Sequence, residues 1–160
     1  MGFDTLSLKG RALRLLSQRE HSRTELQRKL APHVQEGEDL NAVLDELQAK
    51  DFINEARVVE SVLHRRASRL GAARIRQELQ AKGLDAEAVQ NAVAGLQASE
   101  LGRARGVWAR KFAQPPQTPQ ENAKQTRFLL TRGFSGDVVR RVLRGAADDD
   151  GDAGDAGAED

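Results

Sequence analysis

The sequence predicts an all-α protein: an elongated, right-handed stack of three tandem three-helix repeats, followed by a disordered acidic C-terminal tail. Ala, Leu, Arg, Gln and Glu, which favour helices, dominate the composition. Apolar residues recur at helical spacing along most of the chain. A helix–glycine–helix segment also occurs twice, as "LQAKGLDAEAVQNAV" over residues 79–93 and as "LLTRGFSGDVVRRVL" over residues 129–143. A short helical unit cannot bury its apolar face alone, so such units must stack on their neighbours.

The first repeat is predicted over residues 8–53, after an N-terminal extension of residues 1–7. Its first helix carries a stripe of leucines. Its second helix opens with a capping box, in which the Ser22 hydroxyl accepts a hydrogen bond from the Glu25 amide and the Glu25 carboxylate accepts one from the Ser22 amide. Asp39 is expected to cap the third helix.

The second repeat is predicted over residues 54–98. Asn54 is expected to cap its first helix, which Gly71 ends. The next helix ends at Gly83, because the left-handed backbone conformation of a helix C-terminus strains glycine least. Asp85 is expected to cap the sixth helix.

The third repeat is predicted over residues 99–145. It begins with a separate seventh helix over residues 100–113, on which Trp108 and Phe112 are expected to face the core. The eighth and ninth helices are delimited by the same kinds of signal as the earlier ones: Thr118, Pro119, Glu121, Gly133 and Ser135.

The charge is unevenly distributed along the chain. The predicted tail, residues 146–160, carries seven acidic residues and no basic one, while the rest carries 25 basic and 17 acidic residues, a net charge of +8. Nineteen of the 25 basic residues are arginine, which suits bidentate contacts to phosphate or carboxylate. A basic body indicates an anionic partner. The tail either competes with that partner or only keeps the protein in solution.

No catalytic or metal-binding pattern is visible. The chain has no cysteine, and His21, His33 and His64 lack metal-ligand spacing. Gly102 and Gly106 do not form a phosphate-binding loop, because no strand or GK[ST] motif accompanies them. We therefore expect no enzyme activity, no metal and no cofactor. Because neither a membrane span nor a signal peptide is present, we expect a cytoplasmic protein.

The basic residues gather on predicted helices. Residues 61–77 contain five arginines and no acid. Further bases follow in the third repeat, so that the candidate partner-binding or DNA-binding residues are Arg65, Arg66, Arg69, Arg74, Arg76, Arg103, Arg105, Arg110, Lys111, Arg127, Arg132, Arg140 and Arg141. If the repeats stack with a constant rotation, these bases could line one surface. The alternative interpretation is a solvated face with scattered ion pairs.

Several segments in register resemble one known family. "RALRLLSQREHSRTELQRKL", "DELQAKDFINEARVVESVLHRRA", "IRQELQAKGLD" and "RFLLTRGFSGDVVRRVL" resemble the RecX regulatory proteins of bacteria, as does "WARKF" followed by a proline-bearing loop. The resemblance covers roughly residues 8–145 and implies tandem three-helix repeats. The acidic tail departs from the family pattern.

The resemblance also implies a function. RecX proteins bind the RecA recombinase filament on single-stranded DNA and mainly inhibit its ATPase, strand-exchange and coprotease activities, within recombination, DNA repair and the SOS response. We therefore expect a monomeric regulator whose partners are the RecA filament and single-stranded DNA, with double-stranded DNA left open. The alternative is a nucleic-acid-binding helical-repeat protein without a recombinase partner. Exposed aromatics would favour that alternative, and the sequence shows no cluster of them.

Overall fold

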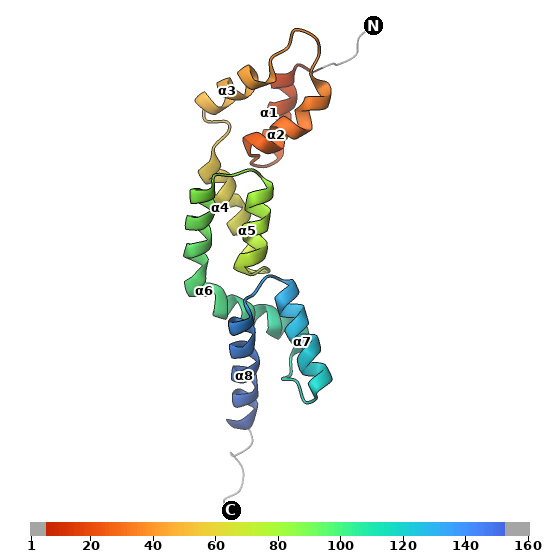
Figure 1. The fold of residues 1–160 in the computed structure, drawn as a ribbon, viewed down its shortest axis with the longest axis vertical. Helices are drawn as coiled ribbons and strands as arrows, with labels where there is room; N and C mark the ends of the chain where they lie inside the picture. Colours follow the sequence, from red (N-terminus) through yellow and green to blue (C-terminus); the bar gives the residue numbers. More distant parts are fainter. Residues whose placement is uncertain (1–5, 153–160) are drawn as a thin grey trace, which may run out of the picture. The chain divides into compact units, whose positions relative to one another are not determined.

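The computed structural model describes residues 6–152, in which every regular element is a helix (Figure 1). The elements in chain order are α1 (Leu8–Gln18), α2 (Arg23–Leu30), the 3₁₀ helix η1 (Ala31–His33), α3 (Leu40–Ala49), α4 (Glu55–Arg66), α5 (Ala72–Ala81), α6 (Ala86–Phe112), α7 (Pro119–Thr131) and α8 (Gly136–Asp152). The predicted all-α class is confirmed for this part of the chain.

Side-chain caps begin the helices where the sequence predicts them. The Glu25 amide donates to the Ser22 hydroxyl at 3.1 Å and the Ser22 amide donates to the Glu25 carboxylate at 3.2 Å, which completes the capping box of α2. At α7, Thr118 caps the helix but the box is altered, because the Glu121 carboxylate accepts from the Gln117 amide. The other predicted caps that accept an amide are Asp39, Asn54 and Ser135.

The predicted sixth and seventh helices form a single helix. α6 is continuous over 27 residues, so the separate helix predicted over residues 100–113 is wrong. Its buried face continues through the expected break at Leu96, Glu100 and Ala104, which are spaced four residues apart. Buried Glu100 is tolerated there because it accepts a hydrogen bond from the Ala72 amide. The predicted boundary between the second and third repeats therefore falls inside a helix.

The start of the predicted disordered tail is also corrected. α8 extends to Asp152, so the first seven residues of the predicted tail are helical. The alanines at 146 and 147 favour helix, and residues 146–150 contain no proline or glycine. Residues 153–160, the rest of the predicted tail, lie outside the described residues.

The residue contacts divide the chain into two units: Met1–Val62 with Glu78–Val89, and Leu63–Gln77 with Gln90–Asp160. In the first unit, α1, α2 and α3 bury an aliphatic cluster made of Leu8, Ala12, Leu26, Leu30, Leu44, Leu47 and Ile53. Removing apolar surface of this kind from water is the main force that holds such short helices together.

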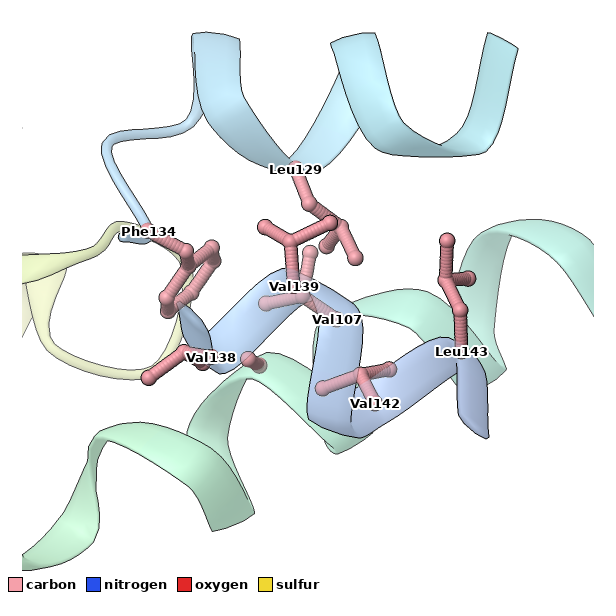
Figure 2. Close-up of a cluster of buried hydrophobic side chains, with 8 residues drawn as sticks. Val107, Leu129, Phe134, Val138, Val139, Val142 and Leu143 are labelled. Atoms are coloured by element: carbon pink, nitrogen blue, oxygen red, sulfur yellow. The ribbon is translucent and has the colours of Figure 1, made fainter. Parts of the chain in front are cut away.

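The second unit has its own core, where α7 and α8 pack on the C-terminal half of α6 (Figure 2). Its buried members are Ala104, Val107, Leu129, Phe134, Val138, Val139, Val142 and Leu143. Trp108 and Phe128 are partly buried; Trp108 packs against this core and its indole Nε1 donates to the Gln125 side chain at 2.7 Å.

The first copy of the repeated segment holds the C-terminal turn of α5 against the start of α2. Gly83 has a φ of +70°, and a Cβ at this position would overlap the Thr24 side chain. The Ser22 hydroxyl donates to the Lys82 carbonyl at 2.6 Å, and the Lys82 ammonium pairs with Glu25 at 3.1 Å. Only glycine allows this approach, because it combines the left-handed conformation with the absence of a side chain.

The second copy makes the equivalent contact between the C-terminal turn of α7 and the start of α5. Gly133 has a φ of +94°, and a Cβ there would overlap Arg74. The Gly71 amide donates to the Arg132 carbonyl at 2.8 Å, and the Ala73 amide donates to the Gly133 carbonyl at 3.2 Å. The repeated segment is therefore an inter-repeat joint: its glycine turn docks on the start of the second helix of the preceding repeat.

Candidate functional site

A cavity of about 280 Å³ in the second unit is lined by Arg69, Val107, Arg110, Lys111, Phe128 and Arg132. Four of these side chains are cationic, two are apolar, and none is acidic. The structure thus brings together four residues that the sequence analysis singled out, from segments far apart in the chain. We call this cavity the Phe128 cavity.

Helix ends supply the cations of the Phe128 cavity. Arg110 and Lys111 lie in the last turn of α6, and Arg132 is the C-cap residue of α7. Arg69 lies in the turn after α4, where the Arg110 guanidinium donates to the Ser68 carbonyl at 2.8 Å. Cations are favoured at helix C-termini because the last carbonyl groups carry partial negative charge. The fold itself therefore stabilises a concentration of positive charge here.

Phe128 forms the aromatic part of the cavity. The Arg132 guanidinium carbon lies 4.9 Å from the centroid of its ring, and the Lys111 ammonium lies 5.8 Å from it. Phe112 packs edge-on against the same ring, with the centroids 5.2 Å apart and an interplanar angle of 88°. Attraction between the cations and the ring face orients them around Phe128.

Arg74 adjoins this group through the inter-repeat joint. Its guanidinium donates to the Thr131 carbonyl at 3.1 Å, one residue before Arg132. Arg74 remains solvent-exposed. It therefore adds a fifth predicted cation to the same region of the second unit.

Arg103 has a different role from the other predicted residues. It is half-buried, and its guanidinium donates to the carbonyls of Ala67 and Leu70 at 2.7 Å and to Leu96 at 3.3 Å. Burial lowers the pKa of Arg103, and the nearby Glu100 acts in the opposite direction. Because these bonds tie the turn after α4 to α6, Arg103 stabilises the fold, and we leave it out of the proposed binding surface.

The remaining predicted residues lie outside the Phe128 cavity. Arg140 is exposed and lies 3.9 Å from Asp137 one turn earlier in α8. Arg66 is half-buried, and the others are exposed: Arg65, Arg76, Arg105, Arg127 and Arg141. Their membership of one continuous binding surface stays a prediction.

Phe128 was missed by the sequence analysis, which weighed only Trp108 and Phe112 among the aromatics. The position of Phe128 on α7 could have revealed it. Leu129 is fully buried, so the residue before it must point away from the centre of the helix's buried apolar face. Lys124 and Arg132 flank Phe128 at four-residue spacing on α7, the spacing that places side chains on one helical face.

Within residues 6–152, no group of three or more His, Asp or Glu side chains is arranged to hold a metal ion. None of the helices in that range is long and apolar enough to cross a membrane.

The joints and the Phe128 cavity define a class of protein, a tandem helical-repeat protein with a basic site. The particular family follows from comparison. Residues 9–47, 54–93 and 98–143 match, in order, the first, second and third three-helix domains of RecX. The chain belongs to the RecX family.

Individual relatives agree with this assignment. The chain is 59% identical over 139 residues to the regulatory protein RecX of Leptothrix cholodnii, which covers 87% of this chain and 88% of the relative. It is 52% identical over 149 residues to the regulatory protein RecX of Ralstonia nicotianae, covering 92% and 94% of the two chains. The crystal structure of RecX from Lactobacillus salivarius has the same fold, with a TM-score of 0.72 at 20% identity over 88% of this chain and 94% of that one.

Proposed function

We propose that the protein binds the RecA recombinase filament on single-stranded DNA and modulates it, mainly by inhibiting its ATPase, strand-exchange and coprotease activities. Membership of the RecX family supports the regulatory role. The observation that carries the proposed contact with the filament is the Phe128 cavity, with four cations and no acid around it. The expected monomeric state and cytoplasmic location belong to the same proposal.

The chemistry of the Phe128 cavity suits a nucleic-acid strand. Arginine binds phosphate oxygens through two parallel hydrogen bonds, and Arg69 and Arg132 are both exposed. Unpaired bases stack on aromatic rings and on guanidinium planes, and Phe128 with Arg132 offers both surfaces. Neutralising phosphates releases counterions, so binding should weaken as salt rises.

Inhibition requires preference for one state of the filament. A ligand shifts an equilibrium only by the difference between its affinities for the two states. We therefore propose that the protein binds an inactive or disassembling arrangement of recombinase and DNA more tightly than the active one. Without such a preference the protein would bind the filament and leave the balance between its active and inactive states unchanged.

The second candidate function is nucleic-acid binding without a recombinase partner. The half-exposed Phe128 favours it, because base stacking needs no protein partner. The two functions make different predictions about where the protein binds.

Co-sedimentation separates them. The protein is incubated with recombinase filaments on single-stranded DNA, with the same DNA alone, and with recombinase alone, and the pelleted fraction is compared. The proposed function predicts more protein in the filament pellet than DNA alone retains at the same salt concentration. Equal retention by naked DNA and by filaments would favour the second candidate.

A further inference from the structure

We propose that the first unit holds a second anion-binding site, which takes phosphate groups of a single-stranded DNA backbone. The inference rests on the proposed function in one respect: the ligand is a DNA strand. The site is a cavity of about 190 Å³ lined by Leu6, Arg11, Arg14, Leu15, Lys29, Leu30 and His33. We call it the Lys29 cavity. None of the sequence-predicted site residues lies in it.

The polar side chains that line the Lys29 cavity are two arginines, one lysine and one histidine. Arg11 and Arg14 come from α1, Lys29 from α2, and His33 from η1. Arg14, Lys29 and His33 are exposed, and Arg11 is half-buried. No acidic side chain lines the cavity among residues 6–152, and within that range neither arginine pairs with a carboxylate. Two arginines and one lysine thus face the same space without a counter-charge from its walls.

A buried histidine holds Lys29 in place. His21 is 1% exposed, and its Nδ1 lies 3.0 Å from the Arg19 carbonyl oxygen, which can only accept a hydrogen bond. Nδ1 therefore carries the proton and Nε2 is an acceptor, to which the Lys29 ammonium donates at 3.4 Å. Burial lowers the pKa of His21, which keeps the ring neutral and able to accept. The Lys29 ammonium is thus positioned by a buried side chain of the first unit.

Among the described residues, both cavities are lined by cationic and apolar side chains and by no acidic one, so both suit the same kind of ligand. The Lys29 cavity combines cations with leucines, and the Phe128 cavity combines cations with Val107 and Phe128. A DNA strand carries a uniform, repeating negative charge, whereas a protein surface usually carries charges of both signs. Two separate sites of the same sign on one chain therefore fit a strand better than an acidic protein surface.

The test measures binding of a fluorescently labelled oligo-dT by anisotropy over a range of salt concentrations. Arg14→Gln with Lys29→Gln removes two charges from the cavity. The matched control, Lys9→Gln with Lys50→Gln, removes two charges elsewhere in the same unit, where both lysines pair with the half-buried Glu46. Thermal melting by circular dichroism establishes that both variants are folded.

The proposal predicts a specific change in salt dependence. Removing two phosphate contacts should reduce the slope of log affinity against log salt by about 1.4, since each contact with single-stranded DNA contributes about 0.7. At about 0.1 M salt this corresponds to a loss of affinity on the order of 10- to 30-fold, which disappears as salt approaches about 1 M. The control variant should retain the wild-type slope.

Two results would overturn the proposal. One is an unchanged slope and affinity for oligo-dT in the folded cavity variant. The other is unchanged oligo-dT binding combined with weaker pelleting on recombinase filaments, which would assign the cavity to carboxylates of a protein partner. Failure of the wild-type protein to pellet with filaments tests the regulatory function instead, because the oligo-dT measurement contains no recombinase.

Discussion

At the scale of single residues, Phe128 links the packing of α7 to its proposed chemistry. Its neighbour Leu129 is buried in the core, while Phe128 remains at the edge of that core under the Arg132 guanidinium. The helical spacing of the apolar residues indicated which positions are buried. It could not indicate which aromatic residue outside the buried stripe borders a cavity, because that depends on α6 and the turn after α4, which close the other sides.

We expect Phe128→Ala to weaken binding to oligo-dT by about 1–3 kcal/mol, the range for loss of one base stacked on an aromatic ring. Leu130→Ala is the control, because Leu130 is 46% exposed on the same helix and does not line the cavity. Fluorescence anisotropy at a fixed, low salt concentration measures both. Equal affinities for the two variants would show that Phe128 does not stack on a base.

Glu25 gives the first inter-repeat joint a dependence on pH. Burial alone would raise the pKa of Glu25, but hydrogen bonds from Arg19, the Ser22 amide and Lys82 outweigh it and lower that pKa from 4.5 to about 2. A carboxyl group whose pKa is depressed in the folded state stabilises the fold above its unfolded pKa. This contribution is lost as the pH falls from about 4.5 towards 2.

Glu25→Gln should therefore lower the free energy of unfolding at pH 7 by on the order of 2 kcal/mol, and the difference from wild type should shrink below about pH 4.5. Urea unfolding at a series of pH values measures it. A difference that stays constant down to pH 2 would mean that the charge of Glu25 contributes nothing to the joint.

At the scale of helices and turns, the two glycine joints explain why the chain repeats one segment. The sequence predicted the turns at Gly83 and Gly133, because both are typical helix C-terminal signals. It did not show that each turn lies against the start of an earlier helix, since that contact joins residues more than 50 positions apart. The sequence did not predict the continuous α6, because the predicted boundary between the second and third repeats, at residues 98 and 99, was interpreted as the end of a helix.

Alanine substitutions should distinguish the joint glycines from ordinary helical ones. Gly83→Ala and Gly133→Ala should each destabilise the protein by about 2 kcal/mol or more, because a Cβ meets Thr24 or Arg74 and the positive φ is strained. Gly95→Ala in α6 should stabilise it by about 0.5–1 kcal/mol, because a Cβ there meets no atom within 4 Å. Melting temperatures of the three variants measure these changes in stability. Equal effects of the Gly83→Ala and Gly95→Ala substitutions would show that the close contact at Gly83 does not stabilise the fold.

At the scale of the whole molecule, charge asymmetry was the feature that the sequence expressed most clearly. Residues 146–160 carry seven acids against a body of net charge +8. The repeat composition predicted the fold class, but the elongated, right-handed arrangement stays a prediction. So does the disorder of the residues beyond Asp152. Composition counts charges without placing them, so the sequence did not separate the cations of the Phe128 cavity from structural Arg103.

Deleting residues 146–160 raises the formal charge from +1 to +8 and leaves the core residues of α8, which end at Leu143, in place. If the tail competes with phosphate, the truncated protein should bind oligo-dT more tightly at low salt. The advantage should fade once the Debye length falls below about 8 Å. Salt titrations that coincide for the two proteins at low salt would assign the tail no role in DNA binding.

The central claim is that the protein restrains a recombinase filament through the Phe128 cavity, and the recombinase's DNA-dependent ATP hydrolysis tests it most directly. Wild-type protein should slow hydrolysis, and Arg69→Gln with Arg132→Gln should raise the concentration needed for half-inhibition by at least about tenfold. The control with Lys9→Gln and Lys50→Gln should inhibit like wild type. The account is contradicted if wild-type protein leaves hydrolysis unchanged, or if the folded cavity variant inhibits as strongly as wild type.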